Sequence, residues 1–307
     1  MSKLYLITGF LGAGKTTFLK NFIKELSEYR LHLIVNEFGK EGIDGQLLRE
    51  LGMAIDEINN GSIFCSCRLD KFEEVLQQAL HKEPDIILVE ASGLSNPTNV
   101  RKILAQSDKF QNVDYMGSIC LVDARQFPKV YETATVVKKQ IGISDVFILN
   151  KVDLVTPEQV EDVKRILFHH RPDLKVFETT FGVIHKEWLD HIEKPNLVPE
   201  KPGIQNMDIT LRKYQIHIHD TFTYYSFQKF IEMFMEDTYR IKGFVKLEGK
   251  TYLVDCVGNL FKAELYEGNP DNLNVIVVLS GSGLPTRRSI KEAIKWYPDD
   301  IKEVEWN

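Results

Sequence analysis

A glycine-rich segment near the start of the chain constrains the fold more than any other feature. Residues 9–17 read Gly-Phe-Leu-Gly-Ala-Gly-Lys-Thr-Thr, a complete G-x-x-x-x-G-K-[ST] pattern, between an apolar run at residues 4–8 and a helical pattern at Lys15–Leu26. Glycines in such a turn let successive backbone N–H groups point at phosphates, and the helix that follows presents its positive end. We therefore expect phosphate contacts from six residues: Gly12, Ala13, Gly14, Lys15, Thr16 and Thr17.

Two of these residues have more specific expected roles. The Lys15 ammonium is expected to reach the β- and γ-phosphates, which makes it a candidate catalytic residue. The Thr16 hydroxyl is expected to be a ligand of Mg²⁺. The alternative for the whole segment is a tight strand-to-helix turn without a ligand.

The rest of the first half alternates strand and helix patterns. Continuous apolar runs occur at residues 33–35, 86–89, 119–122 and 146–149, with helical patterns between them at 69–81 and 99–105 and after them at 157–170. Continuous rather than alternating apolar runs are typical of parallel strands that are buried on both faces. The pattern predicts a doubly wound, mostly parallel α/β domain over residues 1–192.

The second half has a different pattern. Residues 193–206 contain several prolines without periodicity, which predicts a linker. Short strand patterns that follow one another in sequence, with helical patterns at 226–235 and 285–296, then predict a smaller α+β domain over residues 207–307.

Composition excludes several classes of function. The 307 residues, at about 150 per domain, suggest two domains. The net charge of −6 gives no reason to expect binding to nucleic acid or to a membrane surface. No apolar run approaches the ~20 residues that cross a bilayer, and the N-terminus lacks a signal-peptide pattern. With only four cysteines, a disulfide framework is not expected, so we predict a reducing, cytoplasmic location.

A second motif follows the apolar run at residues 146–149. It reads Asn150-Lys151-Val152-Asp153. A carboxylate in this position can accept hydrogen bonds from the N1–H and 2-amino group of guanine, a donor pair that adenine lacks. We therefore expect Asn150, Lys151 and Asp153 to bind a guanine nucleotide, since the motif would have no role in an ATPase.

Two acids and a glycine complete the expected phosphate site. Glu90 ends the apolar run at residues 86–89, where it can approach Mg²⁺, and the N–H of Gly93 can sense the γ-phosphate. Glu37, in a Gly-rich acidic segment, is the candidate for orienting the attacking water, so that Glu37 and Glu90 join Lys15 as candidate catalytic residues. The alternatives are a helix-capping acid for Glu90 and a solvated loop acid for Glu37.

Cys65 and Cys67 form a C-x-C pair in a Gly/Ser-containing loop before a helical pattern. Two thiolates at this spacing can face one soft metal ion, but two sulfurs do not complete a tetrahedral zinc site. Other ligands would come either from elsewhere in the chain or from a second subunit, and the second arrangement would be a homodimer. A redox-active thiol pair and two structural cysteines remain as alternatives.

The ordered set of motifs resembles the CobW-like P-loop GTPases, relatives of the GTPases that insert nickel into hydrogenase and urease. The resemblance rests on residues 9–17, 36–44, the Asn60-Gly61 segment with its cysteines, Glu90-Ala91-Ser92-Gly93 and 150–153. Arg240-Ile241-Lys242-Gly243 also resembles an element of the family's C-terminal domain. The resemblance to this family implies slow GTP hydrolysis coupled to metal delivery or to maturation of a metal- or cobalamin-dependent protein.

Two departures from the family pattern affect the expected metal site. Only Cys65 aligns with the family's C-x-C-C motif, and Lys40 replaces the acid that commonly follows the switch glycine. We expect GTP, GDP and Mg²⁺ as ligands, with Zn²⁺, Co²⁺ or Ni²⁺ as cargo for a client metalloprotein. The alternatives are a GTP-dependent activator of a client that carries no cargo metal, and a nucleotide-binding regulator that does not hydrolyse GTP.

Overall fold

The computed structural model describes residues 1–36, 54–58, 69–91, 93, 100–101, 103–104, 108–172, 175–192, 211–268, 270, 272–281 and 283–306. The chain divides into two compact units, the first Met1–Tyr131 with Thr135–Met207 and the second Glu132–Ala134 with Asp208–Asn307. The linker expected at residues 193–206 lies outside the described residues, so the domain boundaries that depend on it stay predictions.

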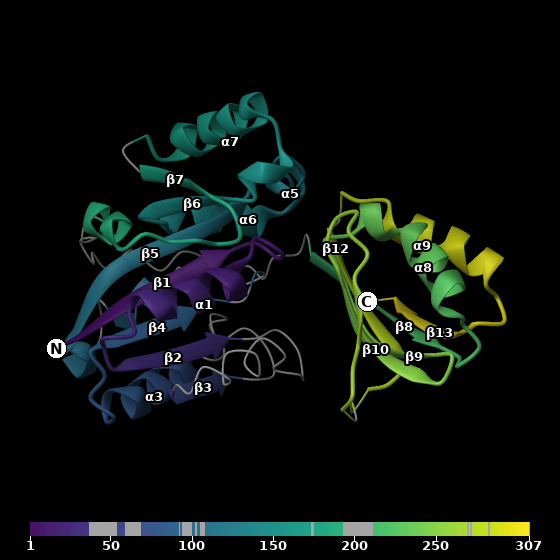
Figure 1. Ribbon diagram of the computed structural model, residues 1–307, viewed down its shortest axis with the longest axis horizontal. Helices are drawn as coiled ribbons and strands as arrows, with labels where there is room; N and C mark the ends of the chain where they lie inside the picture. The colour runs from purple at the N-terminus through teal and green to yellow at the C-terminus, as the bar shows by residue number, and fades with distance from the viewer. Residues whose placement is uncertain are drawn as a thin grey trace. The chain divides into compact units, whose positions relative to one another are not determined.

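The first unit contains a seven-stranded sheet in the order β3-β2-β4-β1-β5-β6-β7 (Figure 1). All of its strand pairs are parallel. The strands are β1 Ser2–Gly9, β2 Leu31–Asn36, β3 Ala54–Ile58, β4 Ile86–Glu90, β5 Val113–Asp123, β6 Val146–Asn150 and β7 Lys175–Thr179. This sheet confirms the predicted α/β class.

Helices cover both faces of this sheet, which is why its strands read as continuous apolar runs. Phe18 and Phe22 of α1 are fully buried against one face, and Phe72 of α3 is fully buried against the other. The helices are α1 Lys15–Glu25, α3 Leu69–Leu80, α5 Phe127–Thr133, α6 Thr135–Ile143 and α7 Pro157–His170, with short 3₁₀ helices η2 Asp108–Phe110, η3 Val152–Leu154 and η4 Lys186–His191.

The strand order places the expected site residues at one edge of the sheet. The chain leaves β1 toward β2 on one side, whereas β5 lies on the other side of β1. Parallel sheets bind ligands at the carboxyl ends of the strands, at such a reversal of strand order. Gly9, Glu90, Asp123 and Asn150 are the last residues of β1, β4, β5 and β6, so all four meet at this edge.

The second unit contains a six-stranded sheet in the order β11-β10-β9-β12-β8-β13, in which every named strand pair is antiparallel. Its strands are β8 Leu211–Ile218, β9 Arg240–Leu247, β10 Lys250–Cys256, β11 Ala263–Leu265, β12 Val275–Gly281 and β13 Ile301–Trp306. Helices α8 Tyr224–Glu232 and α9 Thr286–Trp296, with the 3₁₀ helix η5 Met235–Asp237, contribute to one core with the sheet. This architecture confirms the predicted α+β class.

The Arg-Ile-Lys-Gly element of β9 has a structural explanation within this sheet. A Cβ atom at Gly243 would lie 2.2 Å from the carbonyl oxygen of Val275 on β12, so only glycine fits the close strand pairing. Arg240 makes a bidentate ion pair with Asp255 on β10, with both N–O distances at 2.8 Å. The element therefore joins three adjacent strands.

No helix in the described part of the chain combines the length and the apolar character that a membrane crossing requires.

Candidate nucleotide-binding site

The turn between β1 and α1 has the backbone that a phosphate loop requires. Gly12 and Gly14 have φ angles of 76° and 96°, a region that side chains disfavour. A Cβ atom at Gly14 would lie only 2.4 Å from the side-chain nitrogen of Asn150. Glycine at this position therefore lets the loop approach the end of β6.

Lys15 brings a positive charge into the loop. It is only 9% exposed, and its Nζ donates hydrogen bonds to the carbonyl oxygens of Gly9 at 3.0 Å and Phe10 at 3.3 Å. Thr16 is half-buried and Thr17 is exposed in the first turn of α1. An ammonium held inside a turn at a helix N-terminus is a chemical match for a phosphate chain.

Asn150 connects the expected base-binding motif to the phosphate loop. It is 2% exposed, and its Nδ2 donates to the Ala13 carbonyl oxygen at 2.9 Å while its Oδ1 accepts the Gly182 N–H at 3.1 Å. Asn21 donates to the carbonyl oxygens of Phe181 and Gly182, both at 3.0 Å. The turn after β7 is thereby fixed beside β6, although the sequence motifs did not indicate it.

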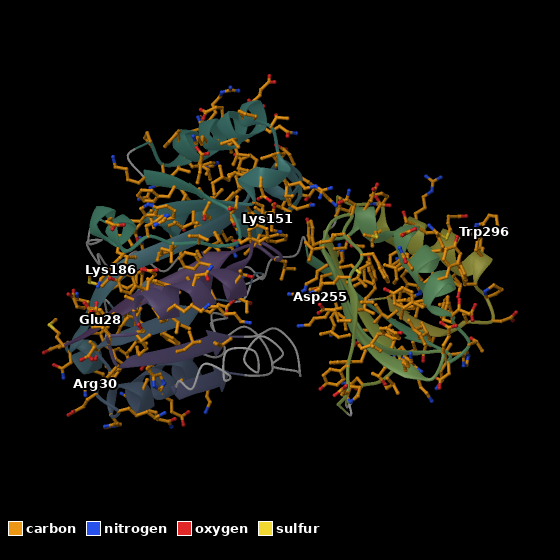
Figure 2. All side chains as sticks on the ribbon, viewed as in Figure 1. Glu28, Arg30, Lys151, Lys186, Asp255 and Trp296 are labelled. Atoms are coloured by element: carbon orange, nitrogen blue, oxygen red, sulfur yellow. The ribbon has the colours of Figure 1, made fainter. Side chains whose placement is uncertain are left out.

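Lys151 makes a second connection to the phosphate loop. Its backbone has a left-handed conformation with φ 64°, and its Nζ donates to the Gly12 carbonyl oxygen at 2.7 Å and to Asp123 Oδ2 at 2.6 Å. Asp153, in η3, is exposed, and its carboxylate makes no hydrogen bond within the described part of the chain. Figure 2 shows Lys151 at the edge to which the strands point, opposite Glu28, Arg30 and Lys186.

Glu90 and Gly93 lie next to the start of the phosphate loop. Glu90 is 5% exposed and pairs in register with Ile7 of β1. A Cβ atom at Gly93 would lie 2.7 Å from the backbone nitrogen of Leu11, and the Gly93 carbonyl oxygen accepts a hydrogen bond from Gln140 Nε2 at 3.2 Å. The structure therefore brings the candidate γ-phosphate sensor into direct contact with the loop.

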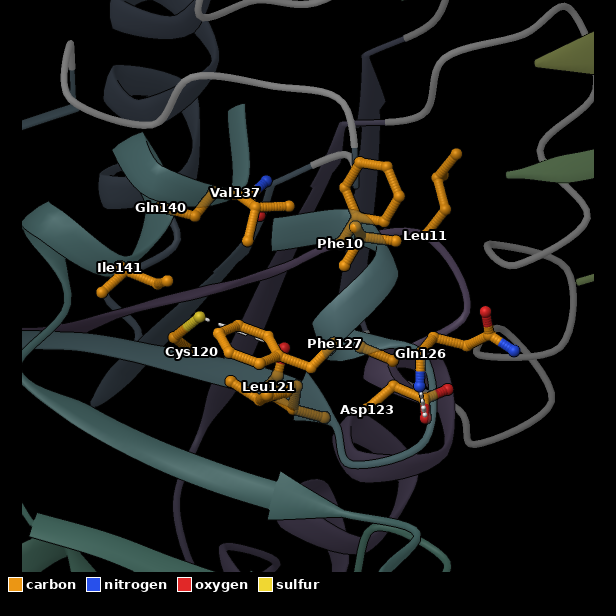
Figure 3. Close-up of a pocket in the computed structure, with 13 residues that line it drawn as sticks. Phe10, Leu11, Cys120, Leu121, Asp123, Gln126, Phe127, Val137, Gln140 and Ile141 are labelled. Carbon is orange, nitrogen blue, oxygen red and sulfur yellow. Dashed lines mark hydrogen bonds between the residues drawn. The ribbon is translucent and has the colours of Figure 1, made fainter. Parts of the chain in front are cut away.

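An apolar cavity lies behind the loop (Figure 3). Phe10 and Leu11 of the loop line it together with Cys120 of β5, Phe127 of α5 and Gln140 of α6. The two apolar residues of the loop thus face the protein interior, which leaves the backbone and Lys15 on the side of the expected phosphates.

The remaining predicted site residues, Glu37, Cys65 and Cys67, lie outside the described residues. The described part of the chain holds no cluster of three or more histidine, cysteine or acidic side chains that could bind a metal ion. Burial raises the pKa of the Cys120 thiol to about 12 and that of the Cys256 thiol to about 11. Neither thiol is therefore suited to act as a thiolate ligand at neutral pH.

Comparison with known proteins identifies both units. Residues 3–178 match the model of the CobW/HypB/UreG nucleotide-binding domain, and residues 212–295 match the model of the cobalamin synthesis protein CobW C-terminal domain. The chain belongs to the CobW/HypB/UreG family. The resemblance expected from the sequence motifs is thereby confirmed, over the matched residues of both units.

Curated relatives are similar over part of their length. Zinc chaperone YeiR of Escherichia coli is 29% identical over 193 residues, which cover 62% of this chain and 58% of YeiR. Zinc chaperone YjiA of Escherichia coli is 32% identical over 156 residues, covering 48% and 49%. Zinc-regulated GTPase metalloprotein activator 1 of Dictyostelium discoideum is 25% identical over 218 residues, covering 58% and 46%. The chain thus spans about half the length of these relatives. The crystal structure of Zn(II)-bound YjiA covers 96% of this chain and 98% of YjiA at 20% identity, with a TM-score of 0.48.

Proposed function

We propose that the protein is a Mg²⁺-dependent GTPase whose nucleotide state controls delivery of a zinc-class transition metal to a client metalloprotein. The observation that carries the nucleotide part is the pair of connections from the base-binding motif to the phosphate loop. Asn150 contacts Ala13 and Lys151 contacts Gly12, so one rigid edge of the sheet can hold a base and a phosphate chain together.

Hydrolysis would depend on positioning and charge neutralisation by this chain's residues. Lys15 would neutralise the β- and γ-phosphates, while Thr16 and Glu90 would hold Mg²⁺. Bound Mg²⁺ supplies charge stabilisation at the phosphate oxygens. Glu37 would orient the attacking water, and Gly93 would register the γ-phosphate through its N–H. The nucleotide motifs at residues 9–17, 90–93 and 150–153 contain no arginine, so the expected turnover is slow, on the order of 10⁻⁴–10⁻² s⁻¹.

The metal part of the proposal rests on relatives and on two thiols. The Escherichia coli relatives YeiR and YjiA both carry the name zinc chaperone, which favours zinc among Zn²⁺, Co²⁺ and Ni²⁺. Cys65 and Cys67 are the proposed thiolate ligands, because the buried thiols of Cys120 and Cys256 are too weakly acidic.

A titration of metal in two nucleotide states tests this function. Zn²⁺, Co²⁺ and Ni²⁺ affinities are measured by competition with a chelator, with GDP and with a non-hydrolysable GTP analogue, for the wild type and for Cys65→Ser/Cys67→Ser. Linkage is reciprocal, so a delivery protein must bind metal differently in the two states, typically by about 1–3 kcal/mol. Cysteine-dependent affinity that shifts with nucleotide supports the proposal. A site that is absent or indifferent to nucleotide refutes cargo delivery.

A second candidate function is activation of a client protein by GTP without a cargo metal. The name of the Dictyostelium discoideum relative, a metalloprotein activator, favours this candidate. The two candidates differ in a pull-down experiment, because an activator retains its client in the Cys65→Ser/Cys67→Ser variant. A regulator that does not hydrolyse GTP is eliminated if Lys15→Ala abolishes measurable turnover.

A further inference from the structure

A buried carboxylate next to the proposed nucleotide site has no role in the mechanism given above. Asp123 is the last residue of β5 and is 7% exposed. Its Oδ1 accepts the backbone N–H groups of Arg125 at 3.0 Å and Gln126 at 3.1 Å, the second of which Figure 3 shows. Its Oδ2 accepts the Lys151 Nζ at 2.6 Å. One carboxylate oxygen thus contacts the turn into α5, and the other contacts the side chain of Lys151.

Lys151 is held from both sides by this arrangement. Its ammonium lies between the carboxylate of Asp123 and the carbonyl oxygen of Gly12, at 2.6 Å and 2.7 Å. Asp123 and Asn150 are in register on adjacent strands, and the Ala124 N–H donates to the Asn150 carbonyl oxygen at 2.9 Å. The ion pair therefore joins the ends of β5 and β6 to the phosphate loop at a single point.

We propose that Asp123 is a positioning residue for the guanine nucleotide. By holding the Lys151 ammonium, it fixes the turn of Lys151 and Asp153 relative to the phosphate loop before the nucleotide binds. This inference rests on the proposed guanine-nucleotide function. It assigns to Asp123 a task that is distinct from contact with the nucleotide, because Asp123 acts through Lys151.

Loss of the Asp123 carboxylate should weaken nucleotide binding because the charged Lys151 side chain then gains conformational freedom. The Lys151 side chain is 30% exposed, so without its anion it can exchange Gly12 for water and move among its rotamers. Nucleotide binding must then order the Lys151 side chain, and this entropy cost reduces the affinity for the nucleotide. Lysine is among the side chains with the most rotamer freedom to lose, and ordering one such side chain weakens binding by about tenfold.

Asp123→Asn removes the ion pair with Lys151 but keeps the oxygen that accepts the backbone N–H groups of Arg125 and Gln126. The asparagine Oδ1 can still accept both backbone N–H groups at the start of the turn into α5, since asparagine and aspartate cap helices about equally well. The side-chain amide carries no negative charge and presents donors toward Lys151. The expected result is an unfolding midpoint lowered no more than that of Lys151→Met, which loses the same ion pair, with GDP affinity about tenfold weaker.

A double-mutant cycle shows whether the effect passes through the lysine. GDP affinities are measured by displacement of a fluorescent GDP analogue for the wild type, Asp123→Asn, Lys151→Met and the double variant. If Asp123 acts through Lys151, the double variant binds GDP no more weakly than Lys151→Met does. Asp123→Ser, which keeps a capping oxygen and cannot reach Lys151, takes the place of Asp123→Asn if that variant does not fold.

Each outcome decides the inference. The role of Asp123 is overturned if Asp123→Asn, or Asp123→Ser in its place, binds GDP as tightly as the wild type. It is also overturned if the affinity losses of the two single variants add up in the double variant. Both results leave the proposed GTPase function intact. If the wild type binds no guanine nucleotide, both the positioning role of Asp123 and the proposed GTPase function are overturned. A loss that is equal in the double variant and in Lys151→Met supports the positioning role.

Discussion

Replacing Asn150 by alanine tests the connection between the base-binding motif and the phosphate loop. Asn150 is 2% exposed and satisfies two buried backbone groups, the Ala13 carbonyl oxygen and the Gly182 N–H. A buried polar group that loses its partner costs about 1–3 kcal/mol. With two such groups, we expect Asn150→Ala to lower the free energy of unfolding of the first unit by about 2–6 kcal/mol without nucleotide.

Asn21→Ala is the matched control for this substitution. Asn21 also makes two hydrogen bonds to the turn after β7, at 3.0 Å each, but one of them is exposed and the other only partly buried. Water can replace Asn21 there, so the expected loss is about 1 kcal/mol. The two variants remove the same number of hydrogen bonds and differ in burial.

Urea unfolding measures both variants. Trp188 reports on the first unit because it stacks on Phe177 with ring centroids 4.7 Å apart. Phenylalanine replaces the two tryptophans of the second unit, so that fluorescence follows the first unit alone. A loss for Asn150→Ala that is below about 1 kcal/mol, or that does not exceed the loss for Asn21→Ala, would show that the two buried hydrogen bonds of Asn150 do not hold the phosphate loop to β6.

Three further substitutions or treatments follow from the structure. Gly93→Ala should weaken GTP binding about tenfold, since its Cβ would lie 2.7 Å from the backbone nitrogen of Leu11 and overpacking costs about 1–3 kcal/mol; unchanged affinity in a binding assay would contradict this. Burial alone would raise the pKa of Asp255, but the hydrogen bond and charge of Arg240 outweigh it and lower the pKa. Stability from this ion pair is therefore present above the unfolded pKa, about 3.9, and is lost as pH falls through the lower folded pKa. Arg240→Met should thus destabilise the second unit by about 1–2 kcal/mol at pH 7, and a difference from wild type that persists undiminished at pH 2 in unfolding experiments would be inconsistent with it. Cys120, 3% exposed and with a pKa raised by burial to about 12, should react with iodoacetamide at pH 8 only when the protein unfolds, as peptide mapping by mass spectrometry would show; rapid labelling of the native protein would rule this out.

The strands in the middle of the first sheet could be predicted because their surroundings leave a simple signal. Both faces of β4 and β6 are buried, so the sequence shows continuous apolar runs. The strands β3 and β13 were not predicted. Each lies at the edge of its sheet and carries charged residues, which edge strands tolerate because one side has no neighbouring strand. Helices α5 and α6 were also missed, and α5 has only seven residues, too few to show a helical periodicity.

The site could be predicted where a motif is contiguous and not where the fold assembles it. The phosphate loop and residues 150–153 were found from local patterns. Gly182 lies 32 residues after Asn150, and only the pairing of β6 with β7 brings the two together. Asp123 did leave a signal, because it follows an apolar run just as Glu90 does. Its pairing with Lys151 required the structure.

Base selectivity is the property that decides whether one edge of the first sheet forms a guanine-nucleotide site. GDP, XDP and ADP are compared as competitors of a fluorescent GDP analogue for the wild type and for Asp153→Asn. The wild type is expected to bind GDP more tightly than XDP or ADP. In Asp153→Asn, the amide offers one donor and one acceptor, which match O2 and N1–H of xanthine, so the preference should move to XDP. Equal binding of GDP and ADP by the wild type, or a preference for GDP that Asp153→Asn leaves unchanged, would show that this edge does not recognise guanine through Asp153.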